Sequence, residues 1–443
     1  MKAKEILDKI LAKDVDQAEV FFASEKTLKI DVLDREVEAI DEIDETGIGI
    51  RVIKDKKLGF AFTSDLDETV LEETIDQAIQ NAGNSERDKF LGLPSSIVVQ
   101  QEGRIELFDE RINKTSIEDK IKIALKIEDA AYKADKRVKK TEKVSYSDSE
   151  SEVTIVNSNG VNANYKLNYC GADAGMIAVS DQEMQMGFGL DFVKKITDLN
   201  PEKIGREAAE RSTQLLGAKP IASQKIPLVI DPYVGSQILG VLAAPLSSES
   251  AQKGKSLFAD KIGQIVGAKS LTIIDNGRLK NGLGSAPFDG EGVPTQETKL
   301  IKNGKLNSFL FNTYTANKGK TKSTGNAARG SFQSLPVIGP TNLYIKPGDK
   351  SHEEIIKSIE KGLFVTRVMG LHTANPISGD FSFGASGIMI ENGEKTFPVR
   401  GITIAGNLIE MLEAIEAVGS DLRFIADIGS PTLLVSGISV SGS

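Results

Sequence analysis

The sequence predicts an α+β fold. The N-terminal half should form an antiparallel sheet with flanking helices, and the C-terminal half a glycine-rich, strand-rich, barrel-like or sandwich-like domain with a few helices. Apolar and polar residues alternate over long stretches, as in strands, and between these stretches apolar residues recur at helical spacing. In the second half, short apolar runs are bounded by glycines. A chain of 443 residues also exceeds one ordinary core. We expect an N-terminal region, 1–218, with 1–100 and 101–218 as a finer division, and a C-terminal domain, 222–443.

The first half contains clear local signals. Alternating runs predict strands that turn within Lys54–Lys57, and the dipeptide Asn159-Gly160 predicts a hairpin. Helical spacing covers 67–81, 116–138 and 201–218; the second helix should be capped by Thr115 or Ser116, and the third should end near Gly217.

The second half opens with a buried strand, IPLVID, and a helix entered near Pro232. Ser351 and Glu354 form a capping box for a helix that should stop at Gly362, which explains His352 without chemistry. Helical spacing returns at 409–418, and a strand should end the chain. Further turns are expected at Asn276-Gly277, Asn303-Gly304 and Asn392-Gly393.

Composition excludes several classes of protein. Hydrophobic residues make up 40% and charged residues 26% of the chain, and no apolar stretch approaches the roughly 18 residues of a membrane span. The first residues, MKAKEILDKILAKDVDQAEVFF, have helical spacing and lack the regions of a signal peptide. Cys170 is the sole cysteine, so no intrachain disulfide can form. We therefore expect a cytoplasmic protein without a membrane partner.

Charge argues against a nucleic-acid partner. The formal net charge of -9 would repel a phosphate backbone. The Lys-rich segment 133–143 is the local exception, and its pattern is typical of the solvated end of a helix.

Searches for catalytic motifs give little. His352 and His372 are the only histidines, too few for a two-imidazole zinc site once the first is explained as part of a helix start. Asp289 and Glu291, in the loop PFDGEG, could offer oxygen ligands to a cation or hold a turn. No serine elbow is present, and the fragments Gly254-Lys255-Ser256 and Gly319-Lys320-Thr321 lack the leading glycine of a phosphate loop.

The glycine-rich block 370–408 is the most informative segment. Its glycines allow tight turns or close approach of another chain. Exposed backbone of this kind could capture an extended peptide as an added strand, or the block could form a barrel with tight corners and no ligand. Both interpretations remain open on these residues alone.

Several segments together resemble the TldD/PmbA family, once described as modulators of DNA gyrase. They are GIGIRVIKDKKLGFAFTSDL, the NSNG turn at 157–160, the long stretch 274–316, STGNAARG at 323–330, and SGDFSFGASG with the IENGE and PVRGITIAGN that follow it. The resemblance extends over nearly the whole chain.

The resemblance implies a division of labour. TldD-type chains carry an H-E-x-x-x-H zinc motif on the helix after the first strand of the second half. In the corresponding stretch, GVLAAPLSSES, we place its two His positions at Ala244 and Glu249 and its Glu position at Pro245. The Cys-containing segment of TldD-type chains is also missing from FIADIGSPTLLV. These departures identify the chain as similar to the TldE/PmbA-type subunits, which hold no metal or other cofactor themselves.

The resemblance further implies a heterodimer with a zinc-bearing TldD-type subunit that degrades or processes unfolded peptides, such as microcin precursors and antitoxins. A self-sufficient homodimer that binds peptides or a regulatory protein is an alternative, and a peptidase with a carboxylate-bound metal is a third. By the resemblance, the residues expected to contact peptide or partner are Asn326, Arg329, Gly379, Asp380, Phe381 and Ser382.

Overall fold

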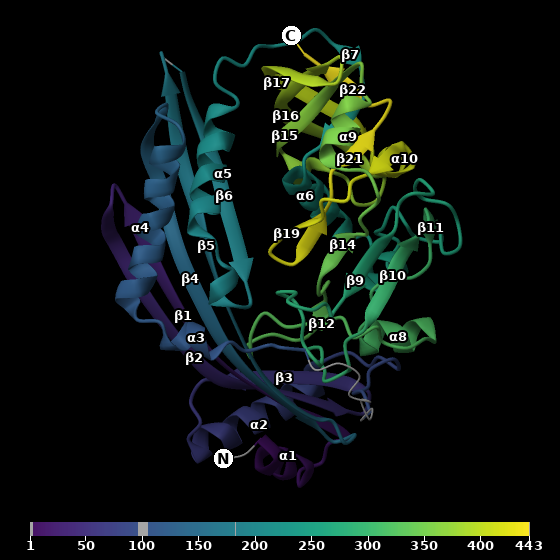
Figure 1. Ribbon diagram of the computed structural model, residues 1–443. Coiled ribbons are helices and arrows are strands. Elements are labelled where there is room, and N and C mark those ends of the chain that lie inside the picture. Colours follow the sequence, from purple (N-terminus) through teal and green to yellow (C-terminus); the bar gives the residue numbers. More distant parts are fainter. Residues whose placement is uncertain (1–2, 96–104, 182, 443) are drawn as a thin grey trace.

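The computed structural model describes residues 3–95, 105–181 and 183–442. A long curved sheet with its helices forms the N-terminal region, and it faces a C-terminal domain built from several smaller sheets (Figure 1). The predicted α+β class is confirmed. No helix of the described residues is long and apolar enough to cross a bilayer.

The N-terminal sheet is antiparallel throughout, and its strands come from both sides of the division considered at residue 100. Asp55 and Lys56, both with positive φ, make the tight turn predicted between Lys54 and Lys57, and the Asn159-Gly160 turn also forms. The strands, in their order across the sheet, are β3 (Lys57–Thr63), β2 (Glu36–Lys54), β1 (Gln17–Leu33), β4 (Val138–Asn157), β5 (Asn162–Ser180) and β6 (Glu183–Val193).

Two helical layers cover this sheet. Ala124, Ile127 and Ala131 repeat at helical spacing and bury one face of α4 against the strands, and the Ser116 hydroxyl accepts the Asp119 N–H as the predicted cap. A separate apolar cluster lies under the first two helices, at the end of the sheet that carries the N-terminus (Figure 1). The helices are α1 (Ala3–Leu11), α2 (Glu68–Asn84), α3 (Glu110–Lys114), α4 (Ile117–Ala134), η1 (Ile196–Asp198) and α5 (Pro201–Thr213).

The C-terminal domain has an eight-stranded and a six-stranded sheet, and α6 (Pro232–Ala243) packs against strands of both. The eight-stranded sheet runs β18 (Ile415–Val418), β21 (Leu433–Val435), β8 (Leu228–Ile230), β15 (Lys361–Met369), β16 (Asp380–Glu391), β17 (Glu394–Asn407), β22 (Ser439–Ser441) and β7 (Gln224–Lys225). The six-stranded sheet runs β11 (Lys305–Leu306), β10 (Glu297–Lys302), β9 (Ile273–Asn276), β14 (Leu343–Ile345), β20 (Ile428–Ser430) and β19 (Arg423–Ile425).

The remaining elements are short. A two-stranded ribbon and small helices connect the sheets, and the Ser351 capping box forms as predicted. These elements are α7 (Ser248–Gln252), α8 (Thr313–Gly319), β12 (Ala327–Ala328), β13 (Val337–Ile338), α9 (His352–Lys357), η2 (Leu371–Thr373) and α10 (Leu408–Glu413).

Several helix ends were predicted too late. Most of the Lys-rich segment 133–143 lies in β4 instead of at a helix end, because Val138 pairs with Ala178 of β5. Helix α9 stops at Lys357, and Gly362 lies in β15. The segment 409–418 is only half helix, since Ile415 begins a strand that pairs with β21. In each case pairing with a distant strand outweighs local helical spacing.

Close packing of α5 on β6 gives a first test. A Cβ added to Gly189 would lie 2.0 Å from the carbonyl oxygen of Ile204, a backbone atom of α5, whereas one added to Gly83 in α2 would meet nothing within 4 Å. We expect Gly189→Ala to lower the free energy of unfolding by about 1–3 kcal/mol. Gly83→Ala should raise it by up to about 1 kcal/mol through helix propensity. Urea unfolding checks both, and a harmless Gly189→Ala would contradict this packing.

Candidate functional site

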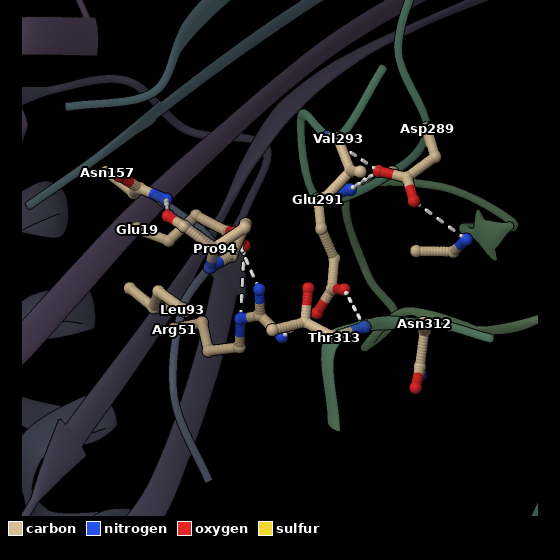
Figure 2. A network of polar contacts seen from close by, with 12 residues as sticks. Glu19, Arg51, Leu93, Pro94, Asn157, Asp289, Glu291, Val293, Asn312 and Thr313 are labelled. Carbon is tan, nitrogen blue, oxygen red and sulfur yellow. Dashed lines mark hydrogen bonds and ion pairs between the residues drawn. The ribbon is translucent and has the colours of Figure 1, made fainter. Parts of the chain in front are cut away.

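A buried ion network joins the N-terminal sheet to the C-terminal domain (Figure 2). Arg51 of β2 donates from Nη2 to Glu19 Oε2 at 2.6 Å and from Nη1 to Glu291 Oε1 at 2.9 Å. The other oxygen of Glu291 accepts the N–H of Thr313, at the start of α8, at 2.9 Å. The three charged side chains are at most 8% exposed. Loss of the arginine would leave the buried Glu291 without its ion-pair partner and Glu19 dependent on Arg329.

Asp289 holds the loop that presents Glu291. Its carboxylate accepts the N–H groups of Glu291 and Val293, each at 2.9 Å, and that of Ala327 at 3.0 Å. Burial, with the neighbouring Glu291 charge, raises the pKa of Asp289 to about 7. These two carboxylates are thus engaged by backbone N–H groups and by Arg51. The part of the chain that the structure describes has no group of three or more His, Cys, Asp or Glu side chains placed to hold a metal.

Arg329 lies within the same network. One Nη atom pairs with Glu19, Nε donates to the carbonyl of Gly290 at 2.7 Å, and the guanidinium lies 4.4 Å from the ring centroid of Phe21. Its side chain is 2% exposed. As placed here, Arg329 fixes the loop after β12 to the N-terminal sheet.

Asn326 is buried nearby. Its amide donates to Asp275 Oδ2 at 2.7 Å and to the carbonyl of Gly339 at 3.1 Å, while its oxygen accepts the Thr324 hydroxyl. These bonds connect the ribbon to β9.

The other four expected contact residues lie at the start of β16 and just before it. Gly379 has φ +84°, and the exposed Asp380 accepts the Asn407 amide at 3.0 Å and the Ser378 hydroxyl, which lowers its pKa. Ser382 is also exposed, whereas Phe381 is buried, as the strand alternation requires. β12 and β16 lie at opposite ends of the C-terminal domain, so the structure does not bring the six residues together (Figure 1).

The positions assigned to the zinc motif do not share a helix. Ala244 is the C-cap of α6, Pro245 follows it, and Glu249 lies in α7, where it pairs with Lys253 at 2.5 Å. The sequence of α6, PYVGSQILGVLA, contains no His, Cys, Asp or Glu. In any register, then, this helix offers none of the usual zinc ligands.

At the opposite end from the Arg51 network, α5 faces the C-terminal domain across a charged cleft. Glu207 of α5 accepts from Arg423 Nη2 at 2.7 Å, and Arg211 bridges Glu207 at 2.9 Å and Asp231 at 3.1 Å. A cavity of about 440 Å³ lies between these elements. A second cavity of about 200 Å³ continues along α5 and shares Arg211 with the first.

His352 lines the larger cavity. Its Nδ1 lies 3.1 Å from the Thr432 hydroxyl, which donates to Asp421 at 2.6 Å, and its Nε2 lies 3.0 Å from Nζ of Lys395. Burial, with the Lys395 charge, lowers the pKa of His352, so the ring is neutral at pH 7. The explanation of His352 from its capping box alone was therefore incomplete. With both ring nitrogens bonded to protein groups, His352 holds Thr432 and Lys395 in the cavity wall.

Sequence reasoning missed the ion pairs that hold the two halves of the molecule together. Arg51 and Glu291 are 240 positions apart, and Glu207 and Arg423 are separated by 216. No local pattern marks them as pairs. The only signal was the pair Asp289 and Glu291, whose spacing suggested a built loop.

Comparison with known protein families places this chain in a class of metallopeptidase-type proteins. It matches the models of PmbA/TldA metallopeptidase domain 1 over residues 18–82, of the central domain over 110–216 and of the C-terminal domain over 223–442. The chain therefore belongs to the TldD/PmbA family, and the resemblance is confirmed.

Individual relatives agree. The chain is 30% identical to metalloprotease PmbA of Escherichia coli O157:H7 over 431 residues, 96% of this chain and 92% of the other. A protein from Thermotoga maritima described as a modulator of a DNA gyrase has a solved structure with TM-score 0.91 and 31% identity, covering 99% of this chain and 100% of its own. TldE from Thermococcus kodakarensis, at TM-score 0.90 and 23% identity with both chains fully covered, shares the fold.

The Arg51 network gives a second test. Arg51→Met should lower the free energy of unfolding by about 3–5 kcal/mol, because the buried Glu291 would lose its ion-pair partner and the buried Glu19 would depend on Arg329. Lys26→Met is the matched control, since Lys26 pairs with Asp44 on the surface and should change little. Thermal and urea unfolding measure both variants. Equal effects would show that the network contributes no more than a surface pair.

Asp289 gives a pH test. An unfolded Asp loses its proton near pH 4, whereas folded Asp289 keeps it until about pH 7. Between these values the folded state binds more protons, so the contribution of Asp289 to the free energy of unfolding falls as pH rises from about 4 to 7. Asp289→Asn should lower stability overall, since an amide nitrogen cannot accept an N–H, yet flatten this slope. Urea unfolding at several pH values measures it, and an unchanged slope would refute the assignment.

Proposed function

We propose that this chain is the non-catalytic, TldE/PmbA-like subunit of a two-subunit metallopeptidase that acts on unfolded peptides. The observation that carries the proposal is helix α6, which lacks every residue type that commonly binds zinc. The catalytic zinc then belongs to a TldD-type partner, and this chain holds no metal.

The cleft supports a role in handling peptide. Its walls combine cationic, anionic and apolar side chains, and α5, β15 and α6 contribute to them. Arg211 and Arg423 are already paired with Glu207 and Asp231 inside the protein, and we therefore expect a ligand that interacts mainly through its backbone.

The proposal predicts activity only in the pair. The purified chain, treated with chelator and resupplied with zinc, should leave an unfolded peptide such as reduced, carboxymethylated lactalbumin intact. Addition of a TldD-type subunit from the same genome should restore cleavage, and a Glu→Gln change in that partner's H-E-x-x-x-H motif should abolish it. Gel electrophoresis and mass spectrometry follow the products, and size-exclusion chromatography follows the complex.

Zinc-dependent cleavage by the isolated chain would refute the proposal and favour an unrecognised metal site. A stable homodimer that binds peptide and ignores the TldD-type subunit would favour the self-sufficient binding module.

A further inference from the structure

Strand β15 is irregular at Thr366. Val365 pairs with Gly387 and Arg367 with Ser386, so Thr366 is a bulge without a partner on β16. On the other side β8 accompanies β15 only as far as Val365, because the chain turns into α6 after Ile230. Among the described residues, therefore, no strand lies beside Thr366–Met369 on that edge.

The smaller cavity, of about 200 Å³, lies at this open edge. Thr366–Val368 form one wall, α6 contributes Tyr233 and Gln237, and β6 contributes Met186 and Phe188. The volume is below the roughly 300 Å³ at which pockets for drug-sized molecules begin. It suits a single residue of a chain that continues beyond the cavity.

Two oxygens beside this cavity have no hydrogen-bond partner among the described residues, Gln237 Oε1 and Thr366 Oγ1. Thr366 as a whole is 5% exposed. Buried polar atoms are almost always bonded, so two such exceptions on residues that line one cavity call for a ligand or ordered water. Both oxygens are covered in this conformation, and binding requires the two side chains to rotate towards the cavity.

The chemistry of the two groups selects the ligand. A carboxamide oxygen accepts a hydrogen bond, and a hydroxyl can donate one. A main-chain amide offers the matching N–H and C=O, and Phe188 and Val368 provide apolar surface for the side chain that accompanies it. Thr366 and Gln237 are uncharged. Two arginines also line the cavity, but Arg211 is paired with Glu207 and Asp231, and Arg367 donates to the carbonyl of Met186. This favours an interior peptide residue over a terminal carboxylate.

We propose that this cavity, between β15, α6 and β6, is a subsite for one uncharged residue of an extended peptide, held through its main-chain amide by Thr366 and Gln237. The open edge of β15 allows the peptide to continue as an added strand. This inference rests on the proposed function, and it assigns the peptide contact to residues other than those expected from the sequence.

The test uses the complete complex, with the partner's motif Glu changed to Gln so that peptide is not cleaved. The probe is a fluorescent, N-acetylated and C-amidated peptide of alternating Val and Ser, and binding is measured by fluorescence anisotropy. Thr366→Val removes the hydroxyl at nearly constant shape and should weaken binding about three- to tenfold, as expected for one lost hydrogen bond. Thr298→Val, at a buried threonine on β10, is the control and should not weaken it.

The thermal stability of Thr366→Val shows whether the Thr366 hydroxyl binds ligand or only supports the fold. Because Thr366 Oγ1 has no partner, Thr366→Val should leave the thermal midpoint unchanged or raise it. A lower midpoint would mean that internal water holds the hydroxyl, and would overturn the inference. A peptide with one N-methylated amide should bind more weakly to the wild type. For this methylated peptide, Thr366→Val should lower the affinity little further.

The outcomes distinguish two failures. If the wild-type complex binds the peptide and Thr366→Val and Gln237→Leu bind it equally well, the subsite is refuted and the proposed function stands. If a free C-terminal carboxylate strengthens binding and loss of the Arg367 guanidinium removes the gain, the site binds chain ends and the inference is wrong. If the wild-type complex binds no peptide at all, the proposed function fails with it.

Discussion

The guanidinium of Arg51 determines how the two halves of the molecule meet. It lies between a carboxylate on β1 and a carboxylate on a loop of the C-terminal domain, and all three groups are withdrawn from water. Such a cluster is stable only when every charge has its partner at short distance. Its geometry therefore constrains the orientation of the sheet against the domain at this end, while Arg211 and Arg423 join the two across the cleft at the other end.

Apolar packing at this joint is modest by comparison. The main clusters belong either to the N-terminal sheet or to the C-terminal domain, and only a small one connects the two, where Phe332 and Phe288 meet Phe21 and Ile155. Polar contacts also join the two parts of the molecule along the edge of β6. There, Arg367 donates to the carbonyl of Met186 at 3.1 Å, and Arg423 donates to that of Leu190 at 3.2 Å. An interface of this kind specifies orientation more than it adds stability, which suits a frame that must hold a cleft open.

Turns and helix caps could be predicted from the sequence, whereas contacts between residues far apart in the chain could not. Turns at Asp55-Lys56 and Asn159-Gly160 and the cap at Ser116 depend on neighbours within a few residues, so their residue types sufficed. Helix ends at Ala134 and Glu413 were missed because a strand partner far along the chain decides them. Gly47 illustrates the limit: a Cβ there would lie 2.4 Å from the ring of Phe332, and nothing nearby in the sequence reveals that contact.

The residues of the candidate site were harder to predict from the sequence than the elements of the fold. Asn326 and Arg329 came from a family resemblance, which marks residues as important without saying whether they face solvent or the interior. In the structure both are buried and fully bonded. Thr366 and Gln237 had no motif at all, because an unsatisfied oxygen becomes visible only when its surroundings are known.

Helix α6 consists largely of residues that pack in the core, and it contains none of the usual zinc-ligand residue types. Leu239 and Leu242 are buried between the two C-terminal sheets, and Pro245 follows the C-cap residue of the helix, Ala244. Ala244 and Glu249 lie on different elements, so imidazoles introduced there would not share one helix face as in a single-helix zinc motif. Imidazoles introduced within the helix would instead replace apolar groups of the core and bury polar nitrogens there. The helix has thus become a structural support, with Tyr233 and Gln237, near its start, reaching the cleft.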